Sequence, residues 1–71
     1  MYRFLAVIEK TGNNFSAYCP DLPGCIATGS TREEVEKNIV EAIEFHIQGM
    51  KEENLPIPQG TASAEVFAIP A

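Results

Sequence analysis

The first thirty residues alternate between short apolar runs and turn-forming residues, a pattern that predicts β-strands. The first run covers Tyr2–Glu9, where aromatic and branched residues fall on both faces, as they do in a central strand. The second run is Phe15–Cys19 and the third is Cys25–Gly29. The links between the runs are short, and Thr11–Asn14 contains residues suited to a turn. We therefore expect an antiparallel meander of three strands.

The next segment has a helical period and runs from Thr31 to about Glu53. A capping box marks its start, because the Thr31 hydroxyl can accept from the backbone N–H of Glu34 and the Glu34 carboxylate can reach back. Pro56 and Pro58 follow its end, where a helix cannot continue through proline. At 3.6-residue spacing one face carries Val35, Ile39, Ala42, Ile43, His46, Ile47 and Met50.

The last apolar run, Ala64–Ile69, predicts a fourth strand. The helix before it is a crossover, so this strand should run parallel to the third through a right-handed connection. The predicted fold class is α+β with the order β-β-β-α-β. It has one four-stranded mixed sheet, strand order 3-2-1-4, with the fourth strand parallel to the first and the helix on one face. The other face would keep apolar surface that only self-association or a partner can bury.

The chain length and composition indicate a single domain, residues 1–71, of which 45% are hydrophobic. A core of this size supplies little stability, so a second subunit is the expected support. No apolar run has bilayer length and no signal peptide precedes the first strand, so we expect a cytoplasmic protein with no membrane partner. Cys19 and Cys25 bracket a short loop. Two reduced, half-buried thiols are favoured, although a disulfide across the loop remains open.

The charges and titratable residues limit the chemistry. The net charge is −5 and the basic residues are scattered, which argues against direct nucleic-acid binding and favours a basic protein partner. A lone histidine and two cysteines do not make a metal site, and we expect no cofactor. His46 lies mid-stripe on the apolar helix face, where a core or interface role is favoured over catalysis. We expect no enzyme activity.

A loop rich in proline joins the second and third predicted strands. It comprises Pro20, Asp21, Leu22, Pro23 and Gly24, and we interpret it as a structural turn that sets the register of its flanking strands. Asp21 either caps the backbone of its own loop or contacts a partner. Candidate partner or oligomer contacts are Tyr18, Asp21, His46 and Phe67.

Several motifs together resemble one family, the HicB antitoxins. They are Tyr18–Cys25 with its PDLPGC turn, Thr28–Thr31 at the helix start, Glu34 and Asn38, Glu41–Ile43, and the pair Ile57–Pro58. The resemblance implies a partial ribonuclease-H-like domain that forms dimers or tetramers. It also implies a partner, since members of that family neutralise HicA toxins, which are small basic RNA-cleaving proteins.

From this resemblance we expect a protein-binding antitoxin domain that covers the active face of a HicA-type toxin. The alternative is a stand-alone oligomeric domain without a toxin, which binds another protein or a small ligand. The chain departs from the family pattern at Ser30, where an Asp is usual, and at Val35, where a small residue is usual. No DNA-binding segment follows Ala71, so we expect no operator binding by these residues.

Overall fold

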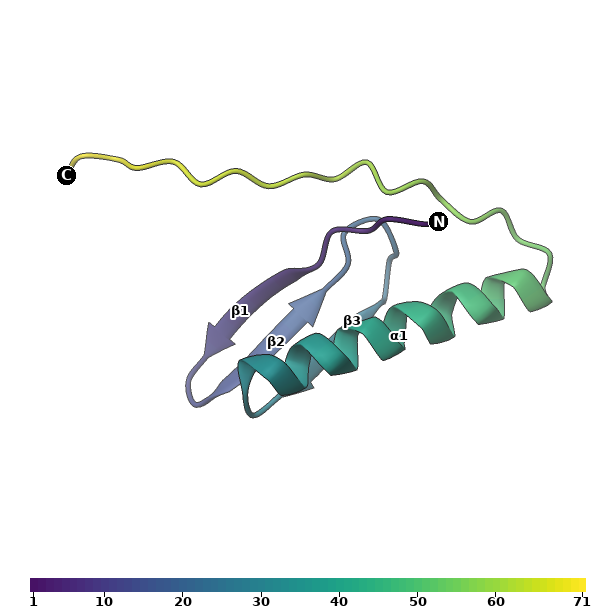
Figure 1. Ribbon diagram of the computed structural model, residues 1–71, viewed down its shortest axis with the longest axis horizontal. Helices are drawn as coiled ribbons and strands as arrows, with labels where there is room; N and C mark the ends of the chain where they lie inside the picture. Colours follow the sequence, from purple (N-terminus) through teal and green to yellow (C-terminus); the bar gives the residue numbers. More distant parts are fainter.

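The computed structural model describes all 71 residues as a three-stranded antiparallel sheet with one helix across a single face (Figure 1). The strands are β1 (Val7–Thr11), β2 (Asn14–Tyr18) and β3 (Ile26–Gly29), and the helix α1 spans Arg32–Glu52. The strand order is β1-β2-β3, so β2 is central and the outer edges of β1 and β3 have no neighbouring strand. No helix has the length and hydropathy that crossing a bilayer requires.

The register of the sheet decides which side chains reach the helix. Ala17 of β2 pairs with Ile8 of β1 and with Ala27 of β3, and all three lie on the helix side of the sheet. Because side chains alternate along a strand, Tyr18 and its cross-strand neighbours point to the opposite face. The covered face is therefore the face that carries the core.

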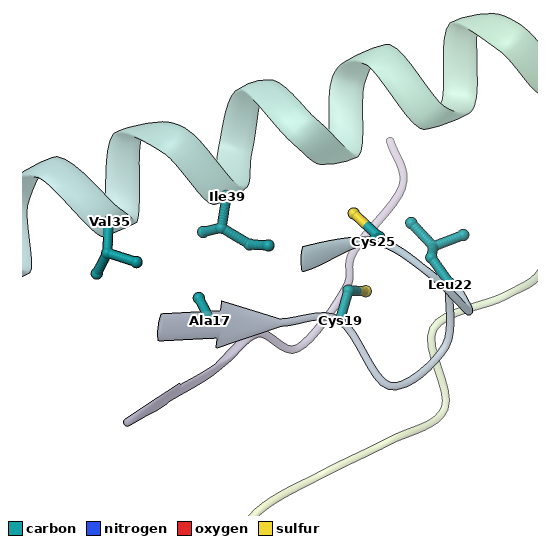
Figure 2. Close-up of a cluster of buried hydrophobic side chains, with 6 residues drawn as sticks. All are labelled: Ala17, Cys19, Leu22, Cys25, Val35 and Ile39. Atoms are coloured by element: carbon teal, nitrogen blue, oxygen red, sulfur yellow. The ribbon is translucent and has the colours of Figure 1, made fainter. Parts of the chain in front are cut away.

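The core is a small cluster between the sheet, α1 and the turn that precedes β3 (Figure 2). Val35 and Ile39 supply the helix side of this cluster, as the apolar stripe predicts. Gly29 allows the close approach, because a Cβ at this position would lie 2.6 Å from the backbone nitrogen of Val35. The cluster consists of Ala17, Cys19, Leu22, Cys25, Val35 and Ile39.

The predicted four-stranded mixed sheet is wrong. Residues 54–71 contain no strand, and the sheet has three antiparallel strands without a parallel pair. The composition of Ala64–Ile69 reports β-propensity, but a strand also needs a neighbouring edge that accepts its hydrogen bonds. In the structure this segment leaves the body of the molecule instead of lying beside β1 (Figure 1).

The predicted boundaries of the first strand are also wrong. β1 begins at Val7 instead of Tyr2, and it is an edge strand instead of a central one. Val7 pairs with Tyr18, the last residue of β2, so residues before Val7 have no opposite strand to bond. Their apolar side chains serve packing instead, and Phe4 lies against the core cluster.

Residues 55–71 form an extended segment that we call the C-terminal arm. It follows a helix end at which Asn54 has a φ of 57° and the Leu55 N–H donates to the Met50 carbonyl at 2.9 Å. The arm then crosses the N-terminal segment, where Gly60 lies so close to the Arg3 carbonyl that no side chain would fit between them. Beyond this close approach the arm runs beside Phe4 and Leu5 and then continues away from the rest of the chain (Figure 1).

Candidate interaction surfaces

The turn Cys19–Cys25 is closed by its own backbone. The Cys19 N–H donates to the Cys25 carbonyl at 3.1 Å, and the Cys25 N–H donates to the Leu22 carbonyl at 3.0 Å. A further bond runs from the Leu22 N–H to the Cys19 carbonyl at 3.1 Å, and Gly24 adopts a φ of 82°. The Leu22 side chain is fully buried beneath the loop (Figure 2). This geometry is that of a rigid structural turn.

Asp21 has a role that the sequence did not indicate. Its carboxylate accepts from the backbone N–H of Ala62 at 3.2 Å and from the Thr61 hydroxyl at 3.4 Å. The turn is thereby tied to the C-terminal arm, forty residues along the chain. The expectation that Asp21 caps its own loop is not met, since the carboxylate bonds go to the arm. No local pattern marks Thr61 and Ala62, because polar residues in a linker give no signal of a distant acceptor.

The polar residues at the start of α1 are engaged in structural bonds. The Thr31 hydroxyl accepts from the Glu34 N–H at 3.0 Å, and the Glu34 carboxylate accepts from the Ser30 N–H at 2.9 Å. The Asn38 side-chain amide donates to the Thr28 carbonyl at 2.8 Å, which joins the helix to β3. Thr31 and Glu34 therefore cap the start of the helix, and Asn38 ties the helix to the sheet.

The sheet face opposite α1 carries a row of apolar side chains. Val7, Tyr18 and Ile26 are cross-strand neighbours on adjacent strands, so they lie side by side. Ile26 is 69% exposed and Tyr18 is 42% exposed. A second row on this face, Glu9, Ser16 and Thr28, is polar. We call these six residues the open sheet face.

The solvent side of α1 is acidic. Its exposed glutamates outnumber its basic residues, and only Glu36 has an ion-pair partner, Arg32, at 3.0 Å. That pair is itself exposed and i,i+4 in the helix, so it contributes little stability. The exposed glutamates of this side are Glu33, Glu34, Glu36, Glu41, Glu44 and Glu52.

The titratable residues do not converge on a reaction centre. His46 is half-buried beside Phe45 and Met50 in a hollow near the end of α1. Cys19 and Cys25 are free thiols in the core, and burial, with a smaller effect of neighbouring Cys19, raises the pKa of Cys25. No three His, Cys, Asp or Glu side chains are grouped so that they could hold a metal ion. The structure also keeps the predicted contact residues apart, since Tyr18 lies on the sheet, His46 on α1 and Phe67 on the arm.

Comparison with known proteins identifies the class of protein to which this fold belongs. Residues 4–71 match the family described as "HicB_like antitoxin of bacterial toxin-antitoxin system". The chain therefore belongs to the HicB-like antitoxin family, and the resemblance carried by the PDLPGC turn is confirmed.

Individual relatives extend this assignment. The chain is 38% identical over 60 residues to a UPF0150 protein of Synechocystis, covering 83% of this chain and 76% of the relative. It is 42% identical over 52 residues to an uncharacterized 14.9 kDa protein of Haemophilus phage HP1, covering 73% of this chain. The match spans only 39% of the length of that phage protein.

A solved structure matches the fold. A chain of the "HicA3 and HicB3 toxin-antitoxin complex" aligns with 86% of this chain and 72% of its own length, at a TM-score of 0.70 and 32% sequence identity. The two chains therefore share their overall fold over most of this chain.

Proposed function

We propose that this chain is an antitoxin domain that binds a small basic HicA-like toxin and covers its active face. The observation that carries the proposal is the match over 86% of the chain to a component of a HicA3–HicB3 complex, at 32% identity. Membership of the HicB-like antitoxin family supports it. The role is binding without catalysis, and it would be performed in the cytoplasm, where such a toxin meets RNA.

The open sheet face is the surface that we assign to the toxin. Tyr18 and Ile26 are adjacent and exposed in its apolar row, at 42% and 69%. Aromatic and aliphatic side chains surrounded by polar ones are typical of the centre of a protein interface. Glu9, Ser16 and Thr28 would form the polar border of that contact on the same three strands.

Net charge supports a basic partner. The chain carries a net charge of −5, and the exposed glutamates on the solvent side of α1 contribute to the acidic field of the whole molecule. Such a field accelerates the encounter with a basic protein and slows it again when salt screens the charges. The association rate with the toxin should therefore fall as ionic strength rises, while the dissociation rate changes less.

Co-expression with the toxin-like product of the neighbouring reading frame tests the proposal. We expect this chain to relieve growth arrest and to co-purify with the toxin. Tyr18→Asp together with Ile26→Asp should abolish both effects, because two charges would be buried in the contact. Phe45→Asp is the matched control, since Phe45 is 82% exposed but lies on α1. Arrest that persists with the unaltered chain, with no co-purification, would refute the antitoxin role.

We also propose that the chain works as a homo-oligomer, a dimer or a tetramer. Seven of its 71 residues are buried, which is a thin core for a domain that must stay folded. A second subunit supplies the missing apolar contacts without a metal or a disulfide. Light scattering on the purified chain measures the mass, and a monomer at micromolar concentration would contradict this proposal.

A further inference from the structure

The isolated chain exposes more surface than a compact protein of its mass. Its accessible surface is 5645 Å². A compact monomer of 7.8 kDa would expose about 4,400 Å², so the excess is about 1,300 Å². The radius of gyration, 13.9 Å, likewise exceeds the roughly 11 Å expected for 71 residues. The excess resides in an elongated shape of 49 × 26 × 19 Å, whose long dimension includes the C-terminal arm (Figure 1).

The backbone hydrogen bonds show the same shortfall. The chain makes 34 backbone–backbone bonds, whereas about 47 to 52 are usual for 71 residues. None of the 34 involves residues 63–71 of the arm or the first six residues, because no strand or helix includes them and none of the remaining bonds reaches them. The unpaired groups therefore concentrate in two extended segments and along the outer edges of β1 and β3.

The arm carries side chains that are typical of a β-strand, but these side chains are exposed because no other segment covers them. Val66 is 93% exposed, Phe67 is 76% exposed and Ile69 is 77% exposed. Branched and aromatic residues are those that strands favour, and such an exposed apolar segment is a ready partner for a sheet edge. β1 provides an edge of that kind, since β2 pairs with only one of its sides.

The contacts at the base of the arm direct it away from its own sheet. Asp21 holds the N–H of Ala62, and Gly60 lies against the Arg3 backbone, so the position of the arm is set two residues before Ala64. From that point the arm leads outward, and its apolar residues meet no other part of the chain that would bury them. A partner molecule must therefore supply the edge.

We propose that residues 64–69 of the arm add a strand to the outer edge of β1 in a second copy of this chain, which returns the same contact. A two-fold exchange of arms pairs the arm and the outer edge of β1 of each molecule in one interface, and it leaves the outer edge of β3 free. If the contact buries the excess accessible surface of both chains, it buries about 2,600 Å², which is within the range of obligate homodimers. Glu65 on the arm and Lys10 on β1 are both exposed and of opposite charge, which favours this pairing over contact between two arms.

The first experiment measures the mass of the purified chain without any toxin, so its outcome does not depend on the proposed antitoxin role. We expect sedimentation of the unaltered chain at twice or more the monomer mass. The triple variant Val66→Asp, Phe67→Asp and Ile69→Asp should sediment as a monomer with unchanged helical circular dichroism. The matched control, Val40→Asp with Phe45→Asp, alters comparably exposed residues on α1 and should keep the assembled mass. An arm variant that keeps the assembled mass would overturn the proposal.

The second experiment distinguishes exchange between copies from closure within one. Lys10→Cys is placed on one tagged chain, and Val66→Cys or Phe67→Cys on a chain with a different tag. Because neighbouring arm residues point to opposite sides, both arm positions are needed. We expect a disulfide between the two tags on mild oxidation, and none when Glu41→Cys on α1 replaces Lys10→Cys.

A chain that carries both Lys10→Cys and the reactive arm cysteine tests whether the arm instead pairs with β1 of its own chain. If dilution produces only a disulfide within one chain, the arm closes on its own β1 and the exchange is refuted. The buried native thiols, Cys19 and Cys25, should not enter these products, and the unaltered chain, oxidised in parallel, checks this.

Discussion

The turn Cys19–Cys25 and the C-terminal arm are both rich in proline and apolar side chains, but their environments are opposite. Within the turn, three backbone bonds connect residues that are at most six positions apart, and Leu22 is fully buried. After Leu55 the arm makes no backbone–backbone bond, and Phe67 remains 76% exposed. Similar residues thus give a closed element where their polar groups find partners nearby, and an open element where the partners are distant.

The two regions meet at a single point. Asp21 belongs to the turn and accepts from Ala62 of the arm, so the rigid element positions the base of the open one. We propose that the arm pairs with a second copy of the chain. In that case the turn Cys19–Cys25 orients the arm for this contact without taking part in the contact itself. We call the turn Cys19–Cys25 the closed region and the C-terminal arm the open region. Four changes test how strongly the two regions differ.

The largest effect is expected from opening the interior of the turn. Leu22→Ala should lower the free energy of unfolding by about 3 kcal/mol, because a fully buried leucine loses its transfer energy and leaves a cavity. Urea denaturation followed by circular dichroism measures it. Leu55→Ala, at a site 48% exposed where the arm begins, should cost less than half as much. Equal losses at the two sites would remove the distinction between the regions.

The helix cap, a second structure built from local bonds, is the next most sensitive feature. Thr31→Ala should lower the free energy of unfolding by about 1 kcal/mol, since the Glu34 N–H loses its acceptor. Thr31→Ser keeps the hydroxyl and should retain most of the stability. If the alanine variant unfolds at the same urea concentration as the unaltered chain, water replaces the cap without loss.

Alkaline pH should weaken the closed region through its thiols. Burial raises the pKa of Cys25, so the folded chain holds that proton more tightly than the unfolded chain does. Stability from this source is complete below the ordinary thiol pKa and is lost as pH rises through the raised value. Urea midpoints measured from neutral to alkaline pH should decline across that window. A Cys25→Ser variant should be less stable at neutral pH and show a flatter decline.

The smallest effect on global stability is expected at the link between the regions. Asp21→Ala should change the free energy of unfolding by less than about 1 kcal/mol, because the bond is partly exposed and the arm is not part of the core. Amide exchange at Ala62 should nevertheless accelerate, because its acceptor is gone. Glu65→Ala removes an acidic side chain further along the arm and should leave that exchange rate unchanged. Slow exchange at Ala62 in the Asp21 variant would mean that another group holds the arm.

Local sequence signals predicted the start and the buried face of the helix, and the antiparallel arrangement of the three strands. The capping box located the start of α1 to within a residue, and the apolar stripe identified Val35 and Ile39 as its buried face. The turn residues between the strands predicted the antiparallel meander. In each case the interacting groups lie close together in sequence, so residue type and spacing carry the necessary information.

The open region was predicted wrongly for a related reason. The residues of Ala64–Ile69 favour extended backbone, and the arm is extended, but propensity does not specify which edge the segment pairs with. The crossover rule placed it beside the first strand, whereas in the structure it has no neighbouring strand. The bond from Ala62 to Asp21 was likewise missed, since it joins residues 41 positions apart.

By itself the sequence determined the family, the three antiparallel strands and the capped helix, because these follow from local patterns and from a motif along the chain. Only the tertiary structure decided that β1 is an edge strand, that the open sheet face presents Tyr18 and Ile26, and that Asp21 holds the arm. The physical reason is that backbone hydrogen bonds and apolar surface must be satisfied in three dimensions. Which distant segment satisfies them depends on where the whole chain has placed its edges.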